Sequence, residues 1–411
     1  MPNYIVGLDI GSSSIKAAIC TENENGDFEI LDYAYVKSKG INKGRISNPD
    51  EALLSIRECI DKLKIATGKD ITDIYVGISS EYCKVISSKG HTYVDGIDSK
   101  VTKQHIENAY LDAKEIILEN DEEIIDCIID YFETDNWDYK NIRNPLGIQC
   151  SVLTINLNLI ISKKNTLNFF EKIISGAGYN FKGVCLSIDC LKNIFLSEKT
   201  EDSNVAIVDI GAEKTDIAIY EKNKLKELAF IPLGGSNITK DLAICLSIDT
   251  NLAEEVKESY SHKFSTPSNG TIKVNESTFD ILLVHDIIEA RLLEIIDYIN
   301  KNIIDENFSN DIEKVIITGD GIAYYENIDY IIKEKIGKNV KVFTKNHFSF
   351  EKSSIITPIS IVKETHDRLK LICDQQMLWN KRVIIDENNN KSKNVKKRGF
   401  SRVKAFLDEI F

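Results

Sequence analysis

The chain has 411 residues, of which 43% are apolar and 28% are charged. At roughly 100–200 residues per domain, this length predicts two or three domains, and the composition excludes a disordered, collagen-like or multi-span membrane chain. The formal net charge of −13 argues against non-specific nucleic-acid binding, so no nucleic acid is expected as a partner. The nine cysteines show no C-x-x-C spacing and are expected to be reduced thiols of a cytosolic protein.

An internal repeat gives the main clue to the fold. Residues 4–20 (YIVGLDIGSSSIKAAIC) and 204–220 (NVAIVDIGAEKTDIAIY) each contain an apolar strand ending in Asp-Ile-Gly, a short polar turn and a second strand. A third strand follows in each copy, over 28–36 and 225–231, so each predicts a three-stranded meander. Helices and further strands come next in both halves, which indicates a mixed sheet with helices on its faces, present twice.

The segments after each meander carry clear signals. Asn48 as N-cap and Pro49 at the first helical position begin a helix that runs to Gly68, and a strand over 71–78 follows. In the second half, apolar spacing predicts helices over 239–246, 252–260 and 287–299 and a strand over 314–318.

The segment 83–164 has no counterpart in the second repeat. Its own helix (103–118) and strands (124–132 and 149–162) predict a small inserted α+β subdomain. We therefore expect a first lobe made of 1–82 and 165–200, a second lobe over 201–382, a flexible basic linker over 383–398 and a terminal helix over 399–411.

The two Asp-Ile-Gly turns are candidates for phosphate binding. Such binding needs several backbone N–H groups directed at one point and small residues that let the ligand approach, which Gly11, Ser12 and Ser13 provide. An aspartate at each strand end, Asp9 and Asp209, could hold a hydrated Mg²⁺ on a nucleotide's phosphates. A single such turn would be an ordinary loop; two matched copies favour a site.

The last residues form an amphipathic pattern. At 100° per residue, one arc of about 140° collects the apolar residues, which are Phe400, Val403, Phe406, Leu407, Ile410 and Phe411. Lys396, Lys397 and Arg398 precede this stripe, and a polar tether precedes them. A helix packed on the core would show the same stripe, but the tether and the basic cluster favour a helix bound to an anionic membrane surface.

The ordered motifs resemble the FtsA family of bacterial division proteins, within the actin, Hsp70 and sugar-kinase superfamily. The resemblance covers nearly the whole chain. It rests on LDIGSSSIK (8–16), GINKGRI (40–46), IYVGIS (74–79), NPLG (144–147), VDIGAEKTD (208–216), IPLGG (231–235) with ITKD (238–241), AE-x-x-K (253–257) and IITGDG (316–321).

This resemblance implies an α/β, two-lobed, actin-like ATPase fold with duplicated ribonuclease-H-like subdomains and an inserted small α+β subdomain. It also implies an ATP and Mg²⁺ site, with Asp9 and Asp209 holding the metal through water. The cofactor-binding residues it assigns are Asp9, Gly11, Ser12, Ser13, Lys16, Asp209, Gly211, Thr215, Asp216, Gly234, Gly235, Glu254, Lys257, Gly319 and Gly321.

The implied function is a scaffold. By resemblance the protein polymerises and tethers filaments of the tubulin-like GTPase FtsZ to the inner face of the cytoplasmic membrane at the division septum, where other division proteins are further partners. Two alternatives stay open, namely a pilus-assembly-type actin homologue and, with less support, a sugar-kinase-like phosphotransferase.

Three departures from the family pattern bear on turnover. Ala212 and Glu213 replace glycines of the second turn, Asp320 replaces a glycine of the adenine motif, and Ser187 stands where relatives carry an acid able to position water. A missing acid predicts weak or absent hydrolysis, so no catalytic residue is assigned.

Overall fold

The computed structural model describes residues 4–24, 26–42, 45–81, 83–96, 98–136, 141–197, 200, 203–260, 269–304, 312–322, 325, 328–337, 339–343 and 353–372. The predicted linker and terminal helix (383–411) lie outside the described residues.

The first lobe is built on a five-stranded sheet of order β10-β6-β1-β2-β3. Its strands are β1 (Ile5–Ile10), β2 (Ser14–Glu22), β3 (Phe28–Lys37), β6 (Asp73–Ile78) and β10 (Asn180–Leu186). Helices α1 (Pro49–Thr67) and α3 (Thr166–Gly176) pack against this sheet, and the short strands β4 (Ile41–Asn42) and β5 (Arg45–Ile46) form a separate ribbon. Helix α1 begins and ends as predicted, because the Asn48 side chain accepts the Glu51 N–H and Gly68 ends the helix with a φ of 65°.

The second lobe repeats this connectivity. Its sheet has the order β13-β12-β11-β16-β17, with β11 (Asn204–Ile210), β12 (Thr215–Glu221), β13 (Lys224–Ile231), β16 (Ile312–Thr318) and β17 (Asn339–Val342). The register is also repeated, since Asp9 pairs with Lys16 in the first hairpin and Asp209 with Asp216 in the second. The structure confirms the duplicated fold predicted from the sequence.

Helices bury one face of the second sheet. They are α6 (Gly235–Leu246), α7 (Thr250–Tyr260), α8 (Ile281–Ile304) and α9 (Ile328–Ile336), and the ribbon β14 (Thr271–Val274) with β15 (Ser277–Asp280) lies beside α7 and α8. Ala206 and Val208 face these helices, whereas Val205 and Ile207 face the core of the first lobe. The alternation means that both faces of the second sheet are buried.

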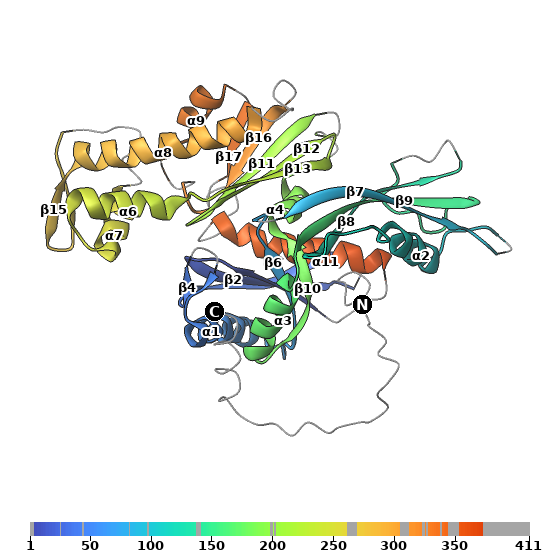
Figure 1. The fold of residues 1–411 in the computed structure, drawn as a ribbon. Coiled ribbons are helices and arrows are strands. Elements are labelled where there is room, and N and C mark those ends of the chain that lie inside the picture. Colours follow the sequence, from blue (N-terminus) through green and yellow to red (C-terminus); the bar gives the residue numbers. More distant parts are fainter. Residues whose placement is uncertain are drawn as a thin grey trace.

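The insertion forms its own small sheet beside the two lobes (Figure 1). Strands β7 (Lys84–Tyr93), β8 (Glu122–Thr134) and β9 (Val152–Lys163) pair in the order β7-β9-β8. Helix α2 (Lys103–Ala113) covers this sheet closely at Gly90, where a Cβ would lie 2.0 Å from the Ala109 carbonyl oxygen. The helix ends about one turn earlier than the predicted 118.

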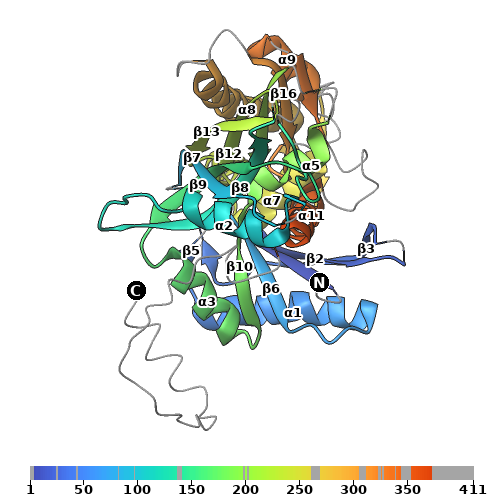
Figure 2. The same ribbon diagram turned by 90° about the vertical axis from the view of Figure 1, so that its right-hand side faces the viewer.

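Helices cross between the lobes. Helix α11 (Ile356–Leu371), preceded by η3 (Ser353–Ile355), follows the second lobe in sequence but packs on β1, β2 and β6 of the first. Gly7 and Gly77 allow this approach, because a Cβ on either would lie 2.9 Å or less from α11 side chains. Conversely, α4 (Ser187–Cys190) follows β10 of the first lobe in sequence but packs on β11 and β12 of the second lobe. Figures 1 and 2 show α11 lying between the two sheets.

This packing differs from the domain boundary of 201–382 expected above. The segment 356–371 belongs structurally with the first lobe. The reason is that Gly7 of β1 and Gly77 of β6 have no side chains, which leaves room on the first sheet for Ile361 and Val362 of α11. None of the described helices is long and apolar enough to cross a membrane.

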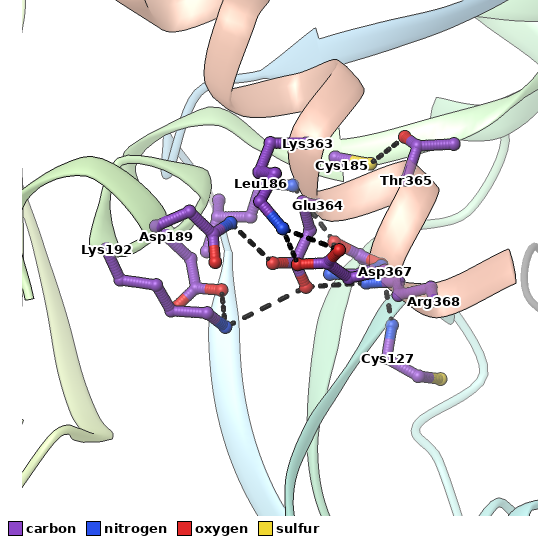
Figure 3. Close-up of polar contacts among 12 residues, drawn as sticks. Cys127, Cys185, Leu186, Asp189, Lys192, Lys363, Glu364, Thr365, Asp367 and Arg368 are labelled. Carbon is purple, nitrogen blue, oxygen red and sulfur yellow. Dashed lines mark hydrogen bonds and ion pairs between the residues drawn. The ribbon is translucent and has the colours of Figure 1, made fainter. Parts of the chain in front are cut away.

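A buried ionic network fills the crossing point of these helices (Figure 3). Arg368 of α11 binds Asp126 of β8 and, at 2.7 Å, Glu364. Lys192 of α5 (Lys192–Phe195) lies 2.6 Å from Asp189 of α4 and 3.8 Å from Glu364. The network therefore ties the insertion to both crossing helices.

The second lobe also contributes to the network. The Tyr220 hydroxyl of β12 donates to Asp189 at 3.0 Å, and the Leu186 N–H donates to Asp126 at 2.9 Å. Burial raises the pKa of Asp189 although Lys192 opposes this effect. Burial also acts to raise the pKa of Glu364, but Lys192 and Arg368 outweigh it and lower this pKa to about 2.

Removing one member of this network should be costly. We expect Asp126→Ala to lower the free energy of unfolding by about 3–5 kcal/mol, because it removes one of the two carboxylates that neutralise the buried Arg368 guanidinium and the acceptor of the Leu186 N–H. The matched control is Asp121→Ala, which removes the exposed Lys163–Asp121 pair next to the same strand and should leave stability unchanged. Urea unfolding of both variants measures the difference; equal effects would contradict the assigned role of the network.

Candidate functional site

The two predicted phosphate turns have the same geometry. The Gly11 N–H donates to the Ser14 carbonyl at 3.1 Å, and the Gly211 N–H donates to the Lys214 carbonyl at 2.9 Å. Each turn follows a strand that ends in Asp-Ile, so Asp9 and Asp209 occupy equivalent positions. Gly11 is required by close approach, since a Cβ there would lie 2.8 Å from the Ser14 carbonyl oxygen.

The first-lobe half of the site contains an ion pair. The Lys16 ammonium lies 2.7 Å from the Asp9 carboxylate, and the two side chains are 8% and 19% exposed. Burial acts to lower the pKa of Lys16, but Asp9, Asp320 and Asp209 together raise it. Lys16 is therefore a positive charge held at the point where carboxylates from both lobes converge.

The second-lobe half contains two carboxylates in register. Asp209 and Asp216 face each other across the β11–β12 pair, where the first lobe has Asp9 and Lys16. Burial, followed by the charges of Asp216 and Asp9, raises the pKa of Asp209 to about 7. A proton or a cation on Asp209 would relieve this repulsion.

Asp216 contacts the first lobe. Its carboxylate accepts hydrogen bonds from the Ser79 hydroxyl at 2.8 Å and from the Ser80 N–H at 2.8 Å, and also from the Ser80 hydroxyl. Both serines follow β6, so they join the strand end of one lobe to the sheet of the other. This role was not predicted from the sequence, although the IYVGIS motif ends on Ser79.

The loop after β16 lies directly on the second turn. The Gly321 N–H donates to the Ile210 carbonyl at 2.7 Å. Gly319 has a φ of +97°, and a Cβ there would lie 2.4 Å from Asp209 Oδ1. Between these glycines, Asp320 accepts hydrogen bonds from the Ser354 hydroxyl and, at 3.2 Å, from the Ser354 N–H. A residue of the second lobe thus holds the segment that begins α11.

Glu254 and Lys257, two of the predicted cofactor-binding residues, also come together. The Lys257 ammonium of α7 is buried and lies 2.7 Å from Glu254, 2.8 Å from the Thr239 hydroxyl and 3.3 Å from the Gly235 carbonyl. Burial lowers the pKa of Lys257, against the effect of Glu254. The N-terminus of α6 reaches the second turn, because the Gly235 N–H donates to the Gly211 carbonyl at 3.0 Å.

Other predicted residues have structural partners. The Thr215 hydroxyl is buried and donates to the Leu233 carbonyl at 2.9 Å, so it stabilises the strand that leads into α6. Gly234 packs against the second turn, where a Cβ would lie 2.5 Å from the Gly211 carbonyl oxygen. Ser12 and Ser13 form the first turn, and the Ser13 carbonyl accepts the Ser38 N–H at 3.0 Å.

The departures from the family pattern fit the backbone. Neither Ala212 nor Glu213 has a positive φ, so these positions do not require glycine. The Glu213 carboxylate is directed toward α6, 3.9 Å from the Lys240 ammonium. Ser187 lies beside the end of β6, and a Cβ on Gly77 would be 2.4 Å from its hydroxyl oxygen. The carboxylate that follows it, Asp189, is bound in the buried network.

The residues present suit a hydrated Mg²⁺ ion. This ion keeps several waters and uses one or two carboxylates together with phosphate oxygens, and Asp9 and Asp209 are such donors. Thr318, in register with Asp209, has a buried hydroxyl with no hydrogen-bond partner among the described residues. A polar ligand beside Asp209 would satisfy it.

The comparisons with known proteins identify the family. The model "Cell division protein FtsA" matches residues 206–360, and the model "SHS2 domain inserted in FTSA" matches 81–161. Together they cover more than half of the chain. The chain belongs to the FtsA family.

Curated relatives agree with this assignment. Cell division protein FtsA of Bacillus subtilis (strain 168) is 26% identical over 367 residues, which are 87% of this chain and 82% of the relative. The protein of the same name from Borreliella burgdorferi is 26% identical over 343 residues, 81% of this chain and 82% of the relative. Each match thus covers about four fifths of both proteins.

Solved structures show the actin-like fold. The PilM-PilN type IV pilus biogenesis complex matches with a TM-score of 0.58 at 15% identity, covering 89% of this chain and 98% of that chain. MreB5 of Spiroplasma citri bound to ADP matches with a TM-score of 0.51 at 12% identity, covering 90% and 98%. The predicted fold class is confirmed.

The raised pKa of Asp209 gives a testable pH dependence. Between its ordinary value of 3.8 and about 7, the folded protein holds a proton that the unfolded chain lacks, so stability falls as the pH rises through this window. Asp209→Asn removes the effect. Without nucleotide, we expect this variant to match the wild type near pH 4 and to exceed its free energy of unfolding above pH 7 by on the order of 4 kcal/mol.

Urea unfolding at several pH values measures this gain. The control is Asp329→Asn, which changes an exposed acid of α9 in the same lobe and should show no such trend. A gain that does not vary with pH would contradict the role assigned to burial of Asp209.

Proposed function

We propose that this protein is an ATP-binding, actin-like scaffold of cell division that polymerises and tethers FtsZ filaments to the inner face of the cytoplasmic membrane at the septum. The observation that carries the nucleotide part is the convergence of two equivalent turns, with Asp9, Lys16 and Asp209, where the lobes meet. Family membership supports the division role, and other division proteins are its further partners.

The residues divide the task of binding. Lys16 offers one positive charge to the phosphates, and Asp9 holds that ammonium in place at 2.7 Å. Asp209 and Asp9 would hold Mg²⁺ through water, and the metal would neutralise phosphate charge. Glu254 and Lys257, fixed to Thr239 and Gly235, would contact the nucleoside.

A scaffold agrees with these contacts better than a phosphotransferase does. A kinase needs a base beside its substrate. Position 187, where an acid would be expected, is a serine, and the nearby Asp189 carboxylate already accepts hydrogen bonds from Lys192 and Tyr220. Nucleotide then acts as a ligand that stabilises one arrangement of the lobes. The pilus-assembly alternative shares the fold, but both family models that match are FtsA models.

Calorimetry with Mg²⁺ and ATP tests the nucleotide site. The wild type should bind, and Lys16→Met should weaken binding by about 10-fold to 100-fold, because a charge-assisted contact worth about 1.5–3 kcal/mol is lost. Lys240→Met, on the exposed side of α6, is the control and should bind normally. If the wild type gives no heat at millimolar ATP, the nucleotide proposal is wrong.

The tail supplies the proposed membrane anchor. Each basic residue near an anionic surface contributes roughly 1 kcal/mol, and each fully buried large apolar side chain about 1.5–3 kcal/mol. A helix this short is unstable in water, so ordering it on the membrane offsets part of the gain. Binding should therefore be reversible and should strengthen when a filament presents many tails together.

Liposome sedimentation tests the anchor. Replacing Phe406 and Leu407 by Glu should release the protein from anionic vesicles and prevent it from recruiting purified FtsZ to them, while ATP binding stays normal. The control replaces Arg402 and Lys404 by Gln, which keeps the apolar face and should weaken attachment only partly. Sedimentation of the Glu variant at the wild-type level would show that the tail is not the anchor.

A further inference from the structure

The contacts between the lobes follow the pseudo-twofold symmetry of the repeat. Gly77 of β6 pairs with Asp9, and Thr318 of β16 pairs with Asp209, so Ser79 and Asp320 occupy equivalent places after these strands. Ser79 binds Asp216 of the opposite lobe. The residue equivalent to Asp216 is Lys16, and Asp320, after Asp9, is one of the carboxylates that raise the pKa of Lys16.

Asp320 stands among groups that are already negative. The loop that carries it packs on the second turn through the hydrogen bond from the Gly321 N–H to the Ile210 carbonyl, and Gly319 lies against the Asp209 carboxylate. Its own carboxylate is fixed by Ser354.

We propose that Asp320 is a selectivity residue of the nucleotide site, which disfavours ligands in proportion to their phosphate charge. This inference rests on the proposed nucleotide binding. The Lys16 ammonium is already paired with Asp9, and the loop that carries Asp320 lies on the second turn beside Asp209, so an incoming phosphate must displace Asp9 while it approaches the added negative charge of Asp320. Each further phosphate brings more negative charge to within a Debye length of Asp320.

Hydrogen bonding and charge can be separated at this position. Asp320→Asn keeps an oxygen that accepts the Ser354 N–H but removes the negative charge. Ser354→Ala keeps the charge and removes one of the two groups that hold it. Asp329→Asn removes an exposed acid elsewhere on the second lobe.

The experiment is calorimetric titration of each protein with adenosine, ADP and ATP, at fixed ionic strength and with Mg²⁺ present. We expect Asp320→Asn to bind ATP about 10-fold more tightly than the wild type, ADP about 3-fold more tightly and adenosine equally well, since only charged ligands feel the carboxylate. Ser354→Ala and Asp329→Asn should keep the wild-type ratio of the three affinities. Asp320→Gly serves as a second charge-removing variant if the Asn protein does not fold.

The outcomes separate this inference from the function on which it rests. ATP binding by the wild type with unchanged ratios in the Asp320 variants overturns the selectivity role alone. Weaker ATP binding by Asp320→Asn also overturns it, because the carboxylate would then assist the metal instead of opposing phosphate. If neither the wild type nor any variant binds any of the three ligands, the nucleotide proposal falls and this inference with it.

Discussion

The ion pair between Arg368 and Asp126 is the constraint on which the arrangement of the molecule depends. It joins α11 to the insertion, while Glu364, one turn earlier on α11, meets Lys192 and Asn193 of α5. Three carboxylates and two cations share a buried space, which costs more desolvation than an apolar core would. Such a network specifies one arrangement of the helices, because each charged group has its partners only in that packing.

That packing decides how the lobes share their elements. Helix α11 belongs to the second lobe by sequence and to the first by contact, and α4 makes the opposite exchange. Each sheet is covered by a helix that follows the other sheet, so neither lobe buries its core alone. Since Tyr220 adds the second sheet to the network, the insertion, the crossing helices and both sheets meet at one point.

Much of this architecture was predictable because it is local. The Asp-Ile-Gly repeats specify two hairpins with one register, and the caps Asn48 and Gly68 specify where α1 begins and ends. What escaped prediction depends on contacts distant in sequence. No local pattern shows that Asp216 turns to Ser79 and Ser80, or that Asp320 binds Ser354, because these partners meet only after the lobes have packed.

The repeat also explains where divergence could occur. Two identical halves would place like charges opposite each other where the lobes meet; this chain has Lys16 in one half and Asp216 in the other. Lys16 gives the site its positive charge, and Asp216 gives the second lobe an acceptor for the Ser79 hydroxyl of the first lobe.

Helix α11 connects this junction to the end of the described chain. Asp320 holds the start of the helix through its hydrogen bond with Ser354. The hairpin of β2 and β3 holds its last turns, because the His366 ring lies 3.1 Å from Glu22 and the Lys370 ammonium donates to the Gly26 carbonyl at 2.9 Å. The helix is thus fixed at both ends and along its length. A ligand that displaced Asp320 from Ser354 would act on the first turn of the same rigid element that leads toward residues 373–411.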